Sequence, residues 1–169
     1  MRATSRLDEM SIANAGRALR AGDLTAGALT EDALSRIAVR DPMIHAFVLV
    51  TRERALADAD KADRDFARGV DRGPMQGIPY ALKDLYETAG IRTTAHSNLL
   101  LDHVPVTDCA VQEKLASGGG VLLGKLGTSS LRSADRASTC RFRRRAIPGA
   151  LTTSLADRPP VRRPRSPPA

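Results

Sequence analysis

The chain has 169 residues, enough for one domain with a core of its own. Aromatic residues make up only 3% of it and Trp is absent, so any core must be built from Ala, Leu, Val and Ile. No apolar run approaches the ~20 residues that a membrane helix needs, and residues 1–10 lack the apolar segment of a secretion signal. We therefore expect a cytoplasmic protein.

Cysteine and histidine give no sign of a structural cross-link or a metal site. The two cysteines, Cys109 and Cys140, indicate no disulfide framework, and the three histidines have no metal-ligand spacing with them. We therefore expect no metal and no cofactor.

The net charge of +7 comes from one end of the chain. Residues 130–169 contain ten Arg, no Lys, two Asp and no Glu, a balance of +8. The first 129 residues hold the other 16 of 26 basic and 17 of 19 acidic side chains, a balance of −1. The basic charge therefore belongs to a tail, which makes a nucleic-acid surface on the domain an unfavoured interpretation.

Three helices are predicted in the first half. Ser11 can cap a helix over 12–21, and Thr25 can cap a second one to about residue 40, where Asp41-Pro42 should stop it. Thr51 can cap a third helix through residue 68. Its apolar stripe consists of Ala55, Ala59, Ala62 and Phe66.

Strands are predicted around and after these helices. Residues 46–50 and 78–82 are short apolar runs, and 121–123 is another. Between the last two, Asp108 can cap a helix over 109–117, which ends at three glycines; residues 87–98 should be loop with a short strand. We therefore predict an α/β fold: N-terminal helices, then the first strands of a mixed or parallel sheet with a βαβ crossover.

A lysine ends the strand at 78–82. Lys83 follows a mostly apolar run, and an ammonium carried into such surroundings must find a partner or lose its proton. Burial can lower a lysine pKa by several units, which would make Lys83 a general base near neutral pH. The alternative is a lysine that reaches water beside Asp84.

A second lysine stands in a glycine-rich context. Gly119, Gly124 and Lys125 have the spacing of a phosphate-binding loop, but Leu126 replaces the Ser or Thr that binds Mg²⁺, and the strand lies inside the motif. We interpret the glycines as a helix stop and Lys125 as a lysine at the end of the sheet.

The stretch Gly77-Ile78-Pro79-Tyr80-Ala81-Leu82-Lys83-Asp84, followed by Thr88-Ala89-Gly90-Ile91-Arg92-Thr93-Thr94, resembles the amidase signature family. The likeness runs from about Leu7 to Ser129. It implies that residues 7–129 are the N-terminal part of an amidase-signature domain. It also implies amide hydrolysis by two serines, one beside a cis peptide, and a lysine.

By this resemblance Lys83 is the catalytic lysine and a small-molecule amide is the substrate of intact relatives. The family's serines lie in a Gly/Ser-rich segment that this chain lacks, since Ser97, Ser117 and Ser129 match no such motif. We therefore expect the 169-residue chain to be inactive. The residues indicate no oligomeric state.

Residues 130–169 have the Arg/Pro-rich composition of a disordered tail. Loss of one base near Ser129 would also explain them, because the neighbouring frame of residues 151–162 permits Asp-His-Phe-Thr-Gly-Gly-Ser-Ser-Ser-Gly-Ser. That is the segment the family has next. The tail is thus predicted to be out of frame, and the chain to be truncated.

Three functions remain open. The first is an amidase-type hydrolase interrupted by a frameshift. The second is a fragment of the A-type subunit of a glutamyl/aspartyl-tRNA amidotransferase, which shares the chemistry. The third is a noncatalytic protein that binds nucleic acid through its basic tail, with a steep salt dependence.

Overall fold

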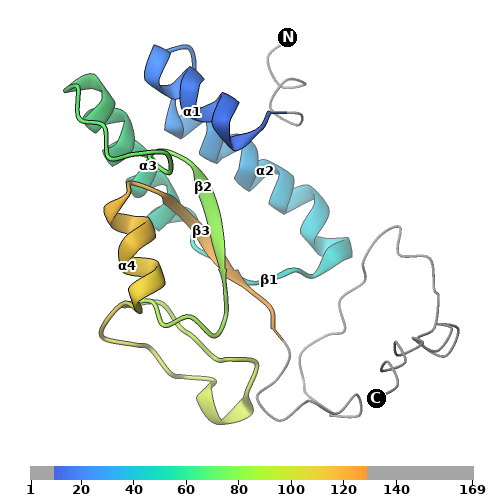
Figure 1. Cartoon of the computed structure of the whole chain (residues 1–169). Coiled ribbons are helices and arrows are strands. Elements are labelled where there is room, and N and C mark those ends of the chain that lie inside the picture. Colours follow the sequence, from blue (N-terminus) through green and yellow to red (C-terminus); the bar gives the residue numbers. More distant parts are fainter. Residues whose placement is uncertain (1–9, 129–169) are drawn as a thin grey trace, which may run out of the picture.

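A computed structural model describes residues 10–128 (Figure 1). The expectations for residues 130–169 concern a part of the chain outside this range. The elements are α1 (Ile12–Ala21), α2 (Ala26–Ile44), β1 (Phe47–Val50), α3 (Arg52–Ala67), β2 (Pro79–Lys83), the short 3-10 helix η2 (Asn98–Leu100), α4 (Ala110–Ser117) and β3 (Val121–Leu126). Within the described range, no helix has both the length and the apolar character to cross a bilayer.

The strands form a mixed sheet in the order β1-β3-β2. β3 pairs with β2 in parallel and with β1 antiparallel. The predicted crossover is confirmed, because β2, α4 and β3 follow one another and the two strands are parallel. Helices α1 and α2 lie on one side of the sheet and α4 on the other (Figure 1).

Two predicted caps begin the first helices. Ser11 Oγ accepts a hydrogen bond from the Asn14 amide at 3.2 Å, and Thr25 Oγ1 accepts one from the Ala28 amide at 3.0 Å. The start of α2 also receives a carboxylate from α3. The Asp63 side chain accepts from Ala26 N at 2.7 Å and from Gly27 N at 3.0 Å. This contact joins α3 to the positive end of α2.

The predicted end of α2 is wrong. The helix continues through Pro42 to Ile44 and ends at His45, which has a left-handed backbone conformation. Only Met43 and Ile44 follow Pro42 in the helix, so a bend caused by the proline displaces little helix after it. Asp41 Oδ1 stabilises the exit by accepting from Ala46 N at 2.7 Å and Phe47 N at 3.0 Å.

Small side chains let α3 approach its neighbours closely. Ala55, Ala59 and Ala62 are almost fully buried, as the stripe predicts, while Phe66 is partly buried against the core. On α2 the buried positions are spaced four residues apart. They are Ala26, Thr30 and Leu34. The core is therefore aliphatic and thin, as the composition requires.

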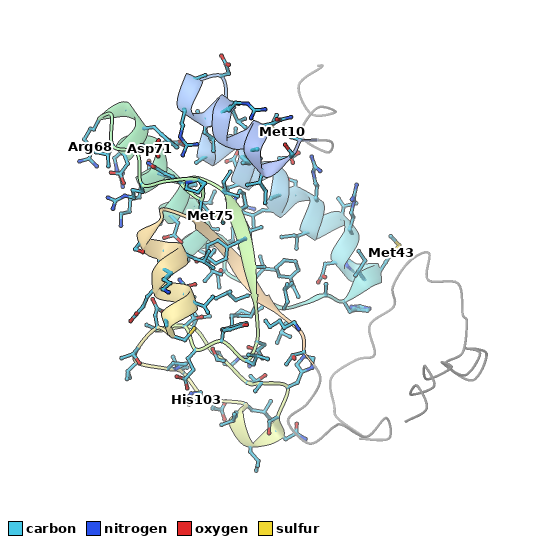
Figure 2. The ribbon with its side chains drawn as sticks, viewed as in Figure 1. Met10, Met43, Arg68, Asp71, Met75 and His103 are labelled. Carbon is cyan, nitrogen blue, oxygen red and sulfur yellow. The ribbon has the colours of Figure 1, made fainter. Side chains whose placement is uncertain are left out.

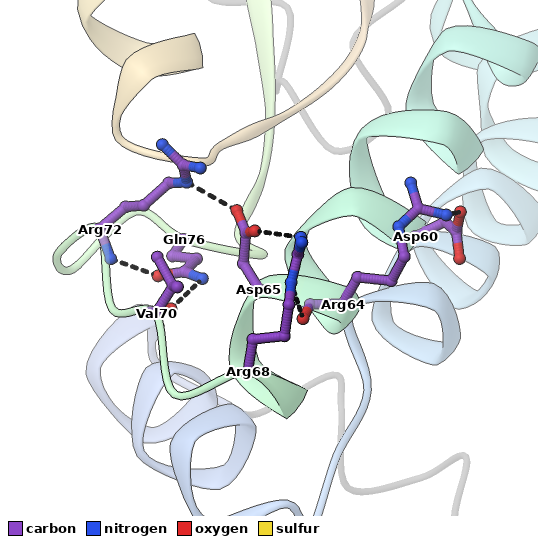
Figure 3. Close-up of polar contacts among 7 residues, drawn as sticks. All are labelled: Asp60, Arg64, Asp65, Arg68, Val70, Arg72 and Gln76. Atoms are coloured by element: carbon purple, nitrogen blue, oxygen red, sulfur yellow. Dashed lines mark hydrogen bonds and ion pairs between the residues drawn. The ribbon is translucent and has the colours of Figure 1, made fainter.

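The loop that leads into β2 is held by a buried polar cluster at the end of α3 (Figure 3). Asp65 accepts from Arg72 Nε at 2.7 Å and from Arg68 at 2.9 Å. The Arg72 hydrogen bond is the main reason that the pKa of Asp65 is lowered. Gln76, also buried, donates to Val70 O at 2.9 Å and accepts from the Arg72 amide. These contacts fix the position at which the chain enters Gly77 and β2.

Gly77 opens the strand in a backbone conformation that favours glycine. Its φ is +72°, and an added Cβ would lie 3.0 Å from the Ala26 side chain and 3.1 Å from Leu19. The glycine of the Gly-Ile-Pro sequence therefore allows β2 to pack directly against α1 and α2.

Two local predictions between β2 and α4 are wrong. Residues 87–98 hold no strand, only the bridge between Thr88 and Ile91. Asp108 does not cap α4, whose first capping residue is Cys109. Asp108 Oδ1 instead accepts from Ala89 N at 2.7 Å, so its carboxylate fixes the preceding loop.

Candidate functional site

Lys83 is the last residue of β2 and lies at the carboxyl end of a parallel strand pair. Its register partner is Leu126, the last residue of β3. Side chains and ligands commonly meet at this edge of parallel strands. The fold therefore places the lysine of the Gly-Ile-Pro-x-x-x-Lys-Asp sequence where a site is expected.

The burial expected at Lys83 is not found. The Lys83 side chain is exposed, whereas Asp84 beside it is fully buried. The Asp84 side chain is therefore not exposed to solvent alongside Lys83. Its Oδ2 accepts from the Thr94 amide at 3.1 Å and from the Thr94 hydroxyl.

The buried lysine of this region is Lys125. It lies near the end of β3, as predicted, but its exposed fraction is 0%. Its ammonium donates to Thr88 Oγ1 at 3.0 Å, to Thr93 Oγ1 at 2.9 Å and to the Tyr86 carbonyl. All three N–H groups therefore have an oxygen partner, which makes burial of the charge possible.

Opposing influences act on the Lys125 charge. Burial lowers the pKa of Lys125, while the nearby negative groups raise it, Asp84 first among them, with Cys109, Asp108 and Glu87 contributing less. Leu82 is the register partner of Lys125 and Leu126 that of Lys83. Because side chains alternate along a strand, the two lysines face opposite sides of the sheet.

The segment after Lys83 folds back on itself before it enters α4. Ala95 N donates to Asp84 O at 2.8 Å, and Thr93 N donates to His103 O at 3.0 Å. Ala95 and His96 both have positive φ, at 47° and 54°, which is uncommon outside glycine. Figure 2 shows His103 in this loop, far from Met10 and Arg68 at the other end of the molecule.

Ser97 and Ser117 have structural roles. Ser97 Oγ accepts from Leu99 N at 3.3 Å and caps the 3-10 helix η2. Ser117 Oγ donates to Lys114 O at 3.0 Å in the last turn of α4. Neither side chain is engaged as a nucleophile beside Lys83. Ser129 lies outside the described residues.

An apolar groove of about 260 Å³ opens between α1, α2 and the sheet. Ile78, Pro79 at the start of β2 and Leu123 of β3 line the groove. Asp32 and Arg36 lie at the groove and form an ion pair at 2.7 Å. On the opposite side of the sheet, Tyr80 donates to Gln112 Oε1 of α4 at 2.8 Å.

The sequence pointed to Lys83 and missed the polar cage around Lys125. The available sequence signal for a buried lysine was Lys125 itself, which follows Gly124 near the end of an apolar strand. The threonines that surround the ammonium come from a loop more than thirty residues earlier in the chain, as the sequence separations of 32 and 37 show. Their convergence depends on how that loop folds back.

Comparison with known proteins agrees with this geometry. The sequence model of the amidase family, described as Amidase, matches residues 28–145. This is more than half of the chain, and the chain belongs to the amidase family. The α/β fold with a mixed sheet is that of amidases of known structure.

Individual relatives point the same way. The chain is 41% identical over 133 residues to the A-type subunit of glutamyl-tRNA(Gln) amidotransferase from Prochlorococcus marinus, with 79% of this chain and 27% of that protein aligned. It is 39% identical over 157 residues to the corresponding protein of Chloroflexus aurantiacus, covering 89% and 32%. The native peptide amidase from Stenotrophomonas maltophilia superposes with a TM-score of 0.66 at 35% identity, covering 70% and 24%. The chain thus spans about a quarter to a third of the length of these relatives.

Proposed function

We propose that residues 7–129 are the lysine-bearing part of an amidase that uses a serine, a cis-serine and a lysine, and that Lys83 is that lysine. The observation that carries the proposal is the position of Lys83. It occupies the motif's lysine place at the carboxyl end of β2, with its side chain exposed at the edge where a substrate would be met.

The chemistry follows from the resemblance. A neutral lysine takes a proton from the nucleophilic serine through the cis-serine, and that serine attacks the amide carbonyl. The C–N bond then breaks, the amine leaves with the proton held by the lysine and cis-serine, and an acyl-enzyme remains. Backbone N–H groups stabilise the oxyanion, and water releases the acid. A small-molecule amide is the proposed substrate class of intact relatives.

The 169-residue chain is proposed to hydrolyse no amide itself. The proposal is supported by the serines that the chain does have, because Ser97, Ser117 and Ser129 match no serine motif of the family. Purified chain and its Lys83→Met variant should be incubated with peptide amides and glutamine, and both should release ammonia at the rate of buffer alone. Turnover that disappears in Lys83→Met would overturn this part of the proposal.

A one-base frameshift after Ser129 is proposed as the origin of residues 130–169. The codons of residues 151–162 should spell the Gly/Ser segment in the neighbouring frame, and sequencing the gene decides this. Codons that do not permit that segment would remove the idea. The family match extends past Ser129 to residue 145 in the present frame, so the codons of residues 130–145 should also be read in both frames.

The role of Lys83 is tested in the frame-restored protein. Lys83→Met should lower kcat by about 10²–10⁴-fold, as expected for loss of a general base. Lys61→Met, which removes an exposed lysine from α3, is the matched control and should leave kcat unchanged. Equal activity of the two variants would show that Lys83 is not the base.

A component of an amidotransferase is the second candidate. It is favoured by the relatives from Prochlorococcus marinus and Chloroflexus aurantiacus, both named as the A-type subunit of glutamyl-tRNA(Gln) amidotransferase. The frame-restored protein would then need charged tRNA and its companion proteins, whereas a hydrolase would cleave peptide amides alone. Ammonia release from simple amides by the isolated protein favours the hydrolase.

A further inference from the structure

We infer that Lys125 is a positioning residue for Lys83: its buried ammonium fastens the segment that follows Lys83 to β3 and thereby fixes the end of β2. This inference rests on the proposed function only for the catalytic role of Lys83. The fastening itself is a property of the described residues.

The first step is the geometry of attachment. Asp84 N donates to Leu126 O at 2.7 Å, so the backbone just after Lys83 is still bound to β3. The chain then leaves the sheet, and Lys125 reaches across to bind it at Tyr86, Thr88 and Thr93. One side chain thus holds the outgoing and the returning parts of the same loop.

The second step is charge. Asp84 and Lys125 are both fully buried, and Asp84 is the strongest attractive influence on the Lys125 ammonium. Asp84 Oδ1 has no hydrogen-bond partner among the described residues. A buried carboxylate oxygen without a donor is unfavourable unless an opposite charge lies near. The charge of Asp84 therefore favours the ammonium form of Lys125, and the loop oxygens hold that ammonium by hydrogen bonds.

The third step connects the clamp to Lys83. The backbone of Lys83 is held in two ways. Lys83 pairs with β3 on one side, and the next residue, Asp84, is itself anchored. Its backbone is held while its long side chain remains exposed. Small displacements of a reacting group are costly in catalysis, so a fixed backbone here has functional value.

Amide hydrogen exchange on the full 169-residue chain tests the clamp without any assay of activity. In Lys125→Met, protection at Asp84, Thr94 and Ala95 should fall at least tenfold more than at Thr51 and Val121. The latter two amides bind Leu123 O and Ile78 O elsewhere in the sheet. Leu34→Ala, which opens the core in α2, is the control and should lower protection at all five amides together.

Chemical rescue separates a charged clamp from simple packing. Lys125→Ala removes three methylene groups and the ammonium, which together correspond to n-propylammonium, and added n-propylammonium should return protection at Thr94 and Ala95 to within threefold of wild type. Tetramethylammonium has no N–H group and should fail. Rescue by neither ion, or by both equally, would overturn the inference.

Thr93→Val keeps the lysine and removes one acceptor, so it provides a test if the Lys125 variants do not fold. Protection at Thr94 and Ala95 should fall more than at Val121. Unchanged exchange in Thr93→Val, or a uniform loss across the sheet in Lys125→Met, would also refute the clamp. Because the readout is exchange, loss of the clamp and loss of the proposed function give distinct results.

Discussion

Charged side chains of this protein behave according to where the fold leaves them, not according to their neighbours in sequence. Lys83 and Asp84 are adjacent, yet one is exposed and the other fully buried. Lys125 can be buried because three oxygens from a distant loop accept hydrogen bonds from its ammonium. At the residue scale, therefore, burial of charge follows the supply of hydrogen-bond partners.

The ion pair between Arg20 and Asp71 gives a prediction at this scale. Arg20 Nε lies 2.7 Å from Asp71 Oδ2, and the hydrogen bond from Arg20 is the main cause that lowers the pKa of Asp71 from 3.8 to about 2. Carbon-13 NMR titration should find the Asp71 midpoint at about 2. In Arg20→Gln it should return towards 3.8.

The sign of the pH dependence follows directly. A carboxyl whose pKa is lower in the folded state stabilises that state above its unfolded value and loses this effect as pH falls. Stability due to the pair should thus decline between pH 3.8 and about 2. Arg17→Gln, on the same helix, is the control and should leave the Asp71 midpoint in place. An unmoved midpoint in Arg20→Gln would contradict the assignment.

Close approaches between elements determine how the sheet and helices are assembled. β1 passes so near to β3 that a Cβ on Gly124 would lie 2.2 Å from Leu49 O, and φ there is +154°. The start of α2 likewise donates hydrogen bonds to the Asp63 side chain of α3. At the element scale, the absence of a side chain at Gly124 lets β1 and β3 approach, and the Asp63 carboxylate joins α3 to α2. Hydrophobic patterns alone do not specify either contact.

Gly124→Ala should disrupt the pairing of β1 with β3. The methyl group has no space, so we expect a loss of about 3 kcal/mol or more in the free energy of unfolding. Urea unfolding measures it. Gly69→Ala is the matched control, because Gly69 also has positive φ, at 73°, but nothing lies within 4 Å of the added Cβ. It should cost only about 1–2 kcal/mol, and equal costs would refute the steric explanation.

Asp63→Ala should weaken the junction of α2 and α3. Loss of a carboxylate that caps two amides should lower the free energy of unfolding by about 1–2 kcal/mol. Asp60→Ala, one turn earlier on α3, removes a carboxylate whose side chain is 63% exposed and pairs with Arg64. Its effect should stay within about 0.5 kcal/mol. Similar losses in the two variants would show that the capping contact has no special value.

The molecule as a whole exposes apolar surface next to an open sheet edge. The groove beside β2 is mostly apolar, and Ile12 at its rim is 62% exposed. Among the described residues β2 has one strand neighbour only. Such edges and patches favour association with other chains.

We therefore expect the chain to self-associate and to have low stability. Sedimentation velocity should show an average mass that rises with protein concentration. Ile12→Lys places a charge at the groove and should shift this rise to higher concentration. Val106→Lys, at a position 91% exposed in a loop away from the groove, is the control. A monomer at all concentrations with a sharp cooperative melt would contradict the prediction.

Local signals in the sequence determined most of the elements. Ser11, Thr25 and the alanine stripe of α3 predicted their helices, because caps and periodicity act within a few residues. The apolar runs predicted β1, β2 and β3, and the strand-helix-strand order predicted the parallel pairing. The motif also picked out Lys83, whose catalytic role stays a prediction.

Only the tertiary structure decided where α2 ends, what Asp108 binds and which lysine is buried. Asp41 stabilises the turn after Pro42 by accepting hydrogen bonds from amides beyond the helix. Asp108 accepts one from an amide nineteen residues away. Lys125 is buried by threonines that the sequence separates from it by more than thirty residues. Partners for polar groups come from whichever segment folds alongside, and no local pattern encodes that choice.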